Sequence, residues 1–458
     1  MIAAKSNLGW VDRARGRGGP VYAAIADALG QAVRDGELQP GDRLPAQRAV
    51  ADHLGIDLTT VTRAYAAARE RGLVEGTVGR GTFVRAPPAN EGGLVDLTMN
   101  LPPPPEGGSL ARLLGETTGA ILHAADASIL MSYHAEFGTA GQRAAGARWL
   151  SPTLGETPLN RVLVAPGAQS ALCAVLSTVC RPGDSLVVEP LTYPGVLSAV
   201  RQLGLRLVVC PVDDAGLVPE ALAEICAGDR PVAAYVVPTL QNPTTVTMSA
   251  ARRREVAKVL DAAGAWIVED DPYSPLLRDP PPAIAAVAPE RTFHIATLAK
   301  SLSPGLRIAY LVCPEGWEAR AAEALRAFAL MPAPLMAAVA SRWINDGSAA
   351  ALLGGVQREA RARRAIAQAV LPQARGDAAS IHVWLPIPEG RSSERLQLAA
   401  RERGLAIVTA DAFASGEGHP SGARISLGGA ASRGALERAL RSVADLLATG
   451  AALPPPIV

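Results

Sequence analysis

Between residues 161 and 312, short apolar runs alternate with longer segments of helical periodicity, and no other feature constrains the fold as strongly. Helical patterns such as Ser170–Cys180, Gly195–Leu203 and Ala250–Ala263 separate the runs. This alternation predicts an α/β domain with a mostly parallel central sheet and helices on both faces. Ligands of such sheets bind beyond the carboxyl ends of the strands. The expected strands are Val162–Ala165, Ser185–Glu189, Arg206–Cys210, Ala233–Val237, Trp266–Asp270, Phe293–Ala296 and Arg307–Val312.

The chain after about Leu330 has a different pattern. Two helical stretches come first, and shorter strands are expected at His382–Leu385, Ala406–Val408 and Arg424–Leu427. We interpret this part as a small α+β subdomain.

The start of the chain predicts a compact helical segment. Apolar residues at helical spacing from Val21 to Val33 indicate a first helix, which Gly36 and the Pro40-Gly41 turn should end. A second helix is expected to begin near Pro45.

A third helix and a hairpin complete this segment. Gly55 suits the tight turn after the second helix, and Asp57 stands where the N-cap of the next helix belongs. That helix should run to about Arg71, and residues 74–84 then alternate around glycines as a two-stranded wing would. The order of helix, turn, helix and wing predicts an α+β winged helix-turn-helix.

In this geometry the last helix enters the major groove of DNA. The sequence therefore predicts double-stranded DNA as a partner, although a small protein-interaction domain would show the same pattern. Exposed residues near the start of the third helix would meet base edges or phosphates, and arginines elsewhere would bind phosphates. The expected DNA-binding residues are Thr59, Thr60, Thr62 and Arg63, with Arg43, Arg48 and Arg80 as the phosphate contacts.

The amino-acid motifs of residues 20–84 identify a family more specifically than the order of helices and turns does. The segments PGDRLP, R-x-x-A-x-x-L-G, T-V-x-R-A-Y and GRGTFV follow one another in this order. Together they resemble the DNA-binding domain of the GntR family of regulators. Members of that family often carry Arg directly after the N-cap of the recognition helix, where this chain has Leu58.

The change of pattern sets the expected domain bounds. Residues 1–85 form the winged helix-turn-helix domain, and the Pro- and Gly-rich residues 86–96 form a linker. Residues 97–458 form the large domain. It opens with LTMNLPPPP, which resembles the segment that crosses the active site in aminotransferase-like proteins.

Composition excludes several other classes of protein. The 44 Lys and Arg nearly balance the 43 Asp and Glu, so net charge alone would not imply a nucleic-acid partner and does not exclude one. Five scattered cysteines without a CxxC pair argue against a disulfide framework or a metal site and suit a reducing cytosol. No apolar run approaches the roughly 18 residues of a membrane span. We expect a cytoplasmic protein with no membrane partner and no metal.

Polar residues with cofactor chemistry stand at the ends of the expected strands. A lysine in an apolar setting, such as Lys300, readily loses its charge, and the neutral amine can form a Schiff base with an aldehyde. Arg307 offers a two-pronged donor for a phosphate. Asp270 could hold a proton on a pyridine nitrogen and so make the ring an electron sink.

Four further side chains suit the same ligand. Asn242 and Tyr273 could donate to a ring hydroxyl, Tyr193 could stack on the ring, and Gln169 opens a helix whose amides suit a phosphate. Each of these residues alone has an ordinary alternative, as a solvated loop residue or a helix cap.

The order of the motifs removes much of that ambiguity. GAQSAL, EPLTYPG, QNPT, EDDPY and TLAKSLSPGLR, in this sequence, resemble the fold-type I aminotransferases over roughly 350 residues. The resemblance implies pyridoxal 5′-phosphate (PLP) as cofactor, with Lys300 as the lysine of the internal aldimine. It implies Asp270 at the pyridine nitrogen, Asn242 and Tyr273 at the 3′-oxygen, Tyr193 stacked on the ring, Ala168, Gln169, Thr297 and Arg307 around the phosphate, and Arg424 on a substrate carboxylate.

Two more points follow from this resemblance. Tyr133 matches a tyrosine that reaches the phosphate in the partner subunit, which implies a homodimer. The chain has Ala299 where the family often has a Ser directly before the lysine. For catalysis, Lys300, Asp270 and Tyr193 are the expected residues.

A GntR-type domain followed by an aminotransferase-like body resembles the MocR subfamily of regulators. The resemblance implies a PLP-binding transcriptional regulator that senses an amino compound, or PLP itself, through the Lys300 aldimine, with no steady-state turnover expected. Two alternatives stay open, namely an active PLP-dependent aminotransferase with a fused DNA-binding domain and a regulator whose body has lost the cofactor.

Overall fold

A computed structural model of the chain describes residues 8–15, 20–34, 37–38, 42–77, 81–84, 94–105, 110–124, 127–130, 132–134, 137–388 and 390–448. The chain divides into two compact units, Met1–Gly93 and Leu94–Val458. Residues 86–93 of the expected linker, which spans residues 86–96, lie outside the described residues. Its last residues, Val95 and Asp96, form strand β3 (Val95–Asp96) of the second unit.

The first unit is a winged helix-turn-helix, as predicted. Its apolar core includes Trp10, Ile25, Val61 and Tyr65, all buried. The Pro40-Gly41 turn and Gly36, expected to end the first helix, lie outside the described residues. The elements are η1 (Gly9–Ala14), α1 (Val21–Arg34), α2 (Gln47–Leu54), α3 (Leu58–Glu70), β1 (Val74–Thr77) and β2 (Gly81–Val84).

The turn between α2 and α3 has the expected chemistry. Gly55 adopts a left-handed conformation with φ 66° at the end of α2, where a side chain would be strained. Asp57 is the N-cap of α3, and its Oδ1 accepts from the backbone N–H of Thr59 at 2.7 Å. These two residues therefore end α2 and begin α3.

A seven-stranded sheet in the order β4-β12-β11-β10-β9-β5-β6 forms the centre of the second unit. β12 runs antiparallel to the other six strands, which are parallel to one another, so the predicted mostly parallel sheet is confirmed. The strands are apolar and mostly buried because helices cover both faces. They are β4 (Val162–Ala165), β5 (Ser185–Val188), β6 (Arg206–Val209), β9 (Ala233–Val236), β10 (Trp266–Asp270), β11 (Thr292–Thr297) and β12 (Ala309–Val312).

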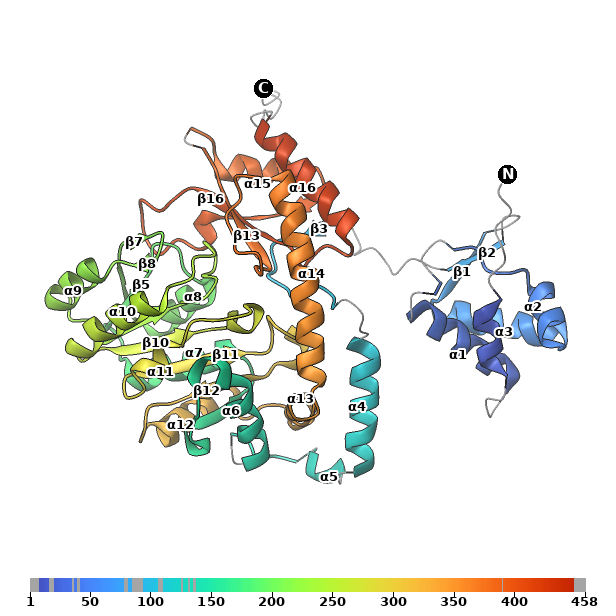
Figure 1. Ribbon diagram of the computed structural model, residues 1–458, viewed down its shortest axis with the longest axis horizontal. Coiled ribbons are helices and arrows are strands. Elements are labelled where there is room, and N and C mark those ends of the chain that lie inside the picture. Colours follow the sequence, from blue (N-terminus) through green and yellow to red (C-terminus); the bar gives the residue numbers. More distant parts are fainter. Residues whose placement is uncertain are drawn as a thin grey trace. The chain divides into compact units, whose positions relative to one another are not determined.

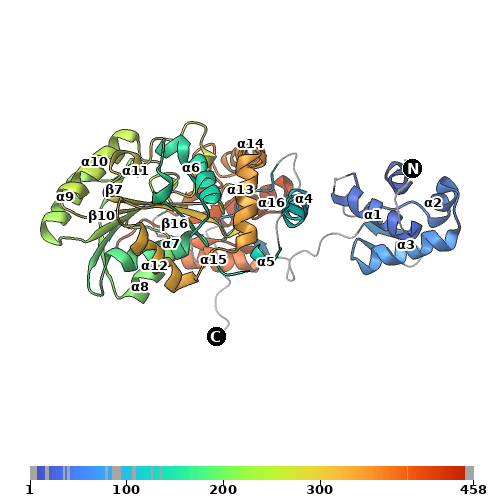
Figure 2. The ribbon, with the colours of Figure 1, turned by 90° about the horizontal axis from the view of Figure 1, so that it is seen from below.

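The helices pack in two layers against this sheet. Figure 2 shows α6, α10 and α11 on one side of the sheet, with α7, α8 and α12 on the other. The helices of these layers are α6 (Ala140–Leu154), α7 (Ala168–Val179), α8 (Pro194–Leu203), α9 (Pro219–Gly228), α10 (Ala250–Ala262), α11 (Ile284–Val287) and α12 (Glu318–Ala329). Short elements connect them, namely η2 (Leu159–Arg161), β7 (Val212–Asp213), β8 (Gly216–Leu217), η3 (Ser274–Leu276) and η4 (Pro304–Leu306).

The small subdomain has its own core and a three-stranded sheet in the order β13-β16-β15. The long helix α14 (Ser348–Val370) runs into it from the sheet domain (Figure 1). Its other elements are β13 (His382–Pro386), α15 (Ser393–Glu402), β14 (Leu405–Ala406), β15 (Val408–Thr409), η5 (Ala410–Ala412), β16 (Gly422–Ser426) and α16 (Arg433–Ala448). Helices α4 (Leu110–Ala124), α5 (Ala127–Leu130) and α13 (Pro334–Asn345) complete the unit. Over the described part of the chain, no helix combines the length and apolarity that crossing a bilayer requires.

Two predicted strands need correction. The strand expected from Arg307 begins at Ala309, because Arg307 has a left-handed φ of 50°, which extended strands do not contain. The single strand expected at Ala406–Val408 is two strands in different sheets. β14 pairs with β3 and β15 pairs with β16.

Candidate functional site

The predicted ligand-site residues converge at the edge where the parallel strands of the central sheet end. Ala168 and Gln169 begin α7 directly after β4, Asp270 is the last residue of β10, and Lys300 follows β11. Their charges also act on one another, since Asp270 and Arg307 both shift the pKa of the Lys300 ammonium.

Lys300 is held by a backbone group of the chain segment that opens the second unit. Its Nζ donates to the carbonyl oxygen of Asn100 at 2.7 Å. Burial, and then the positive charge of Arg424, lowers the pKa of Lys300 to about 8. About a tenth of the lysine is therefore a neutral, nucleophilic amine at pH 7.

Asp270 has one satisfied and one bare carboxyl oxygen. Oδ2 accepts from the hydroxyl of Tyr235 at 2.6 Å, whereas Oδ1 is buried without a hydrogen-bond partner among the described residues. Burial raises the pKa of Asp270 to about 6, and the bond from Tyr235 opposes that rise. A bare buried acceptor of this kind calls for a donor from a ligand, such as a protonated ring nitrogen.

A place for a phosphate lies at the start of α7. The backbone N–H groups of this twelve-residue helix begin at Ala168, after Gly167 with φ 105°. The guanidinium of Arg307 lies so close that a Cβ at Gly167 would be 2.6 Å from Nη2. A helix N-terminus beside a guanidinium favours a dianion.

Gln169 and Tyr193 line the next part of the site. Gln169 Nε2 donates to the Gly195 carbonyl at 3.0 Å, while its buried Oε1 has no partner among the described residues. Tyr193 is the N-cap residue of α8, and burial and then Asp270 raise the pKa of its hydroxyl. A Cβ at Gly195 would lie 2.1 Å from the Tyr193 ring, so this close approach requires glycine.

Asn100 connects several groups of the site. Its Nδ2 donates to the Tyr273 hydroxyl at 2.9 Å and lies 3.0 Å from Nδ1 of His382. Burial, and then the charge of Arg424, lowers the pKa of His382 to about 3, so its ring is neutral. The ring accepts from Asn100 at Nδ1 and donates from Nε2 to the carbonyl of Gln241 at 3.4 Å.

Arg424 is bonded to the same chain segment. Its Nη1 donates to Oδ1 of Asn242 at 2.7 Å, and its Nη2 donates to the carbonyl of Thr98. Its buried Nε has no partner among the described residues, and the guanidinium lies 4.9 Å from the centre of the Phe413 ring. A carboxylate could pair with Arg424 by taking over these neutral contacts.

Two further predicted residues have different surroundings. Thr297 uses its hydroxyl within the fold, donating to the Ile308 carbonyl at 3.2 Å and accepting from the Ala299 N–H at 3.2 Å. Tyr133 is 82% exposed, and its expected place in a partner subunit stays a prediction.

The residues present fit PLP. The bare Oδ1 of Asp270 suits the pyridine nitrogen, and the α7 N-terminus with Arg307 suits the phosphate. Lys300 supplies an amine of lowered pKa. Asn242 and Tyr273 lie on the side of Asn100 and Arg424, where their expected contact with a ring hydroxyl stays a prediction.

Sequence reasoning missed three residues of this site, namely Asn100, Tyr235 and His382. Asn100 lies in the segment expected to cross the site, so its presence there could have been found from that resemblance. Tyr235 and His382 lie inside strands β9 and β13, and nothing local distinguishes them from other strand residues.

The predicted DNA-binding residues belong to the first unit, and they differ in exposure and in the contacts of their side chains. Thr59 donates its hydroxyl to Asp57 at 2.5 Å, and Thr62 donates to Gln47 at 2.8 Å. Thr60 is half-buried, and the guanidinium of Arg63 lies 4.6 Å from the centre of the Tyr22 ring. The backbone of Arg43 forms an isolated antiparallel β-bridge with that of Phe83. Arg48 is exposed on α2, and Arg80 lies outside the described residues.

Comparisons with known families divide the chain in the same way. Residues 105–443 match the family "Aminotransferase class I and II", and residues 21–84 match "Bacterial regulatory proteins, gntR family". The HTH-type transcriptional regulator YdeF of Bacillus subtilis is 30% identical over 88% of each chain. The HTH-type transcriptional regulator TauR of Rhodobacter capsulatus is 27% identical over 87% of this chain and 91% of its own.

Solved structures support the fold of the second unit. LysN, an α-aminoadipate aminotransferase of Thermus thermophilus, covers 84% of this chain and 98% of its own with a TM-score of 0.71 at 23% identity. The kynurenine aminotransferase of Pyrococcus horikoshii covers 80% and 95%, with a TM-score of 0.72 at 23% identity. At this identity the likeness establishes the fold alone.

Proposed function

Because the chain belongs to the MocR subfamily of GntR-type transcriptional regulators, with a second unit of the PLP-dependent class I and II aminotransferase family, we propose that it is a DNA-binding regulator that senses a ligand at Lys300. The ligand is a small amino compound, or PLP itself, and the regulator acts as a homodimer on a double-stranded operator. One observation carries the proposal. The amine of Lys300 donates a hydrogen bond to the backbone carbonyl of Asn100, in the segment that opens the second unit.

We call residues 94–101 the crossing segment. It is the first described part of the second unit, directly after residues that join it to the DNA-binding unit. It holds three groups of the site, because its carbonyls accept from Lys300 and Arg424 and the Asn100 amide donates to Tyr273.

The residues of the site would divide the work as follows. When bound, PLP supplies an aldehyde that condenses with amines and a ring that withdraws electrons. Asp270 would hold a proton at the ring nitrogen, and the α7 N-terminus with Gln169, Thr297 and Arg307 would hold the phosphate. Asn242 and Tyr273 would orient the ring hydroxyl, Tyr193 would stack on the ring, Arg424 would bind an effector carboxylate, and Tyr133 would complete the site of a partner subunit.

Occupation of the site would change the bonds of the crossing segment. A lysine whose Nζ is covalently engaged would keep one N–H when protonated and none when neutral, so its hydrogen bond to the Asn100 carbonyl would be weakened or lost. An effector carboxylate on Arg424 would compete with the Thr98 carbonyl, because a charge-assisted pair is stronger than a bond to a neutral oxygen.

Such changes regulate DNA binding only if the DNA-bound and free states differ in their affinity for the ligand. The test is therefore fluorescence anisotropy of the full-length protein on its own upstream DNA at fixed salt, with PLP and with individual amines. A ligand that changes the Kd for this DNA, but not for a scrambled sequence, is the expected result. Equal Kd values with and without PLP and every amine would contradict the proposal.

The expected control is Lys300→Ala. This variant should still bind DNA but should lose both the visible absorption band of amine-bound cofactor and the response to amines. A response that persists in Lys300→Ala would place the sensor elsewhere.

An active aminotransferase is the second candidate, since Lys300, Asp270 and Arg424 all lie at the site. A multiple-turnover assay with amino acid and keto acid separates the two functions. A regulator should stop at one half-reaction per site or show none, and sustained turnover would favour the enzyme.

A further inference from the structure

A cavity separate from the Lys300 site is lined in part by the loop that carries Asn242. Its volume is about 360 Å³, and none of the predicted cofactor residues lines it. Its walls come from the end of β5, the β7–β8 hairpin, the loop from Gln241 to Val246, and the small subdomain. The side chains that matter for its chemistry are Glu189, Gln241, Asp213, Asp214, Arg375 and Trp384.

Glu189 is the unusual member of this lining. Its side chain is buried, with 4% exposure, although carboxylates are rarely buried without a cation. Among the described residues, hydrogen bonding to this carboxyl comes from Gln241 alone, whose Nε2 donates to Oε2 at 2.8 Å. Burial raises the pKa of Glu189 to about 8, so the carboxyl keeps its proton at neutral pH.

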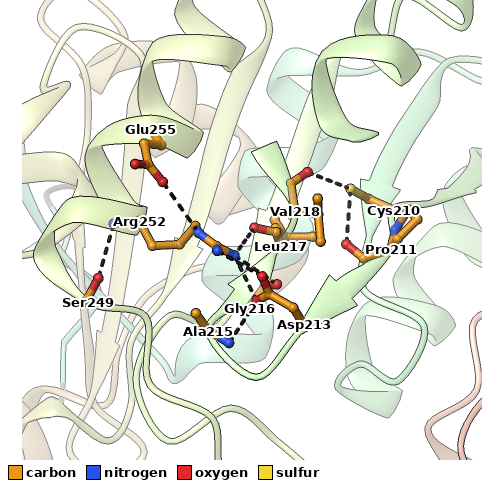
Figure 3. A network of polar contacts seen from close by, with 10 residues as sticks. All are labelled: Cys210, Pro211, Asp213, Ala215, Gly216, Leu217, Val218, Ser249, Arg252 and Glu255. Carbon is orange, nitrogen blue, oxygen red and sulfur yellow. Dashed lines mark hydrogen bonds and ion pairs between the residues drawn. The ribbon is translucent and has the colours of Figure 1, made fainter. Parts of the chain in front are cut away.

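The other charges near the cavity are already compensated. Arg252 donates to Asp213 at 2.9 Å and to the Leu217 carbonyl at 2.8 Å (Figure 3). These bonds hold the hairpin wall in place and neutralise the charge of Asp213. At the mouth, Asp214 and Arg375 are 3.6 Å apart and largely exposed, so their pairing contributes little.

The neighbouring thiol does not compete for this role. Burial, and then Glu189, raises the pKa of Cys210 to about 12, and its Sγ donates to the Pro211 carbonyl (Figure 3). Most of the remaining wall is apolar and includes Leu191, Val246 and the buried indole of Trp384. Glu189 is therefore the one uncompensated ionisable group among the described residues of this cavity.

We propose that this cavity is a second ligand site, separate from Lys300, which binds a small organic ammonium with its nitrogen toward Glu189 and its apolar part against Trp384. A cation favours the ionised carboxyl, so binding converts Glu189 from the acid to the carboxylate and releases its proton to solvent. Apolar and aromatic walls around a carboxylate are the environment in which ammonium groups bind.

Gln241 connects this cavity to the cofactor site. Its side-chain Nε2 donates to Glu189 on the cavity side, and its backbone carbonyl accepts from His382. The next residue, Asn242, accepts from Arg424 through its side-chain oxygen. An ionised Glu189 would bind the Gln241 amide more tightly, because hydrogen bonds to charged acceptors are stronger.

The probe for the test is benzyltrimethylammonium, which has no N–H and therefore cannot condense with the cofactor aldehyde. Its binding to the full-length protein is measured by isothermal titration calorimetry at pH 7 and pH 9 in buffers of different ionisation enthalpy. Saturable binding with release of close to one proton per site at pH 7, and of far less at pH 9, is the expected result. Heat no larger than that of an equal concentration of sodium chloride would overturn the proposal.

The key variant is Glu189→Gln, which keeps an acceptor for Gln241 but cannot ionise. Its affinity for the probe should fall at least about tenfold and its proton release should vanish. The matched control, Asp214→Asn, removes an exposed acid from the mouth of the same cavity and should change the affinity less than about threefold. Unchanged binding by a folded Glu189→Gln would refute the proposal. If that variant fails to fold, proton release by the unaltered protein that is equal at pH 7 and pH 9 would refute it instead.

Discussion

The Nζ of Lys300 lies 2.7 Å from the carbonyl oxygen of Asn100, although 200 residues separate them in the chain. The same Asn100 donates its side-chain amide to Tyr273 beside His382. The reactive amine is therefore positioned by the crossing segment, the part of the second unit that is nearest in sequence to the DNA-binding unit.

The first prediction concerns Asn100→Ala. Removal of the amide leaves the buried Tyr273 hydroxyl and His382 Nδ1 without their common donor, which should lower the free energy of unfolding by about 1–3 kcal/mol. The backbone carbonyl that accepts from Lys300 remains in this variant, but the crossing segment loses its side-chain connection to Tyr273 and His382. We therefore expect it to transmit the state of the site less well, so the ratio of DNA Kd values with and without an amine should approach one. Urea unfolding and anisotropy measure the two effects. Asn160→Ala, at an exposed position, is the control and should change neither.

The second prediction is a pH dependence of cofactor attachment. Because the pKa of Lys300 is lowered to about 8, its neutral fraction grows as pH rises towards that value. The rate of PLP attachment, followed by absorbance in stopped flow, should rise about tenfold per pH unit below pH 7 and level off above about pH 9. A rate that keeps rising to pH 10 would mean that the pKa of the lysine is not lowered.

Arg424→Gln tests the origin of that pKa. The positive charge of Arg424 favours the neutral form of Lys300, so its loss should raise the pKa of the lysine and move the midpoint of the rate profile to higher pH. Lys258→Gln, which removes an exposed positive charge on α10, should leave the midpoint in place.

The third prediction concerns Tyr235→Phe. The Tyr235 hydroxyl donates to Asp270 at 2.6 Å and favours the carboxylate, so its loss should raise the pKa of Asp270 above about 6. PLP should then bind more weakly, and the loss should be larger at pH 6 than at pH 8, because more Asp270 is protonated at the lower pH. Equilibrium titration of the apoprotein with PLP gives both values. Tyr310→Phe, at another buried tyrosine, should show no such pH dependence.

The strands were predictable because their chemistry is local. Val162–Ala165 and Trp266–Asp270 are apolar runs that need no distant contact to be identified, and the structure has them at these bounds. Arg307 was wrongly assigned to a strand, since it is the C-cap residue of η4, and its left-handed φ of 50° ends that short helix before β12 begins.

The same distinction applies to the site. The sequence alone predicted Lys300, Asp270 and Arg307, because these residues belong to motifs that follow one another in a recognisable order. Asn100 and His382 act through bonds across 173 and 282 residues, and only the tertiary fold determines such partners.

The fourth prediction concerns Gly167→Ala. A Cβ at this position would lie 2.6 Å from Arg307 Nη2 and would displace the guanidinium from the α7 N-terminus. The affinity for PLP should fall at least about tenfold, whereas pyridoxal, which lacks the phosphate, should bind nearly as before. Gly183→Ala is the matched control, because its φ of 92° imposes a similar backbone strain in open space. Equal losses for PLP and pyridoxal would show that the substitution acts on the whole site and not on the phosphate.

The fifth prediction concerns DNA binding by α2 and α3. Arg48→Ala and Arg63→Ala each remove an exposed cation of the first unit, and each should weaken binding to the upstream DNA. If Arg48 contacts a phosphate, its loss should weaken specific and scrambled DNA alike and reduce the slope of log K against log salt by about one. Arg63, near the start of the third helix, should instead affect the specific sequence more. Arg69→Ala, in the last turn of the same helix, should leave specific binding within about twofold because it lies away from the end that enters the groove. The cofactor absorbance should stay unchanged in all three variants, and full DNA affinity in Arg63→Ala would contradict the assignment of α3 as the recognition helix.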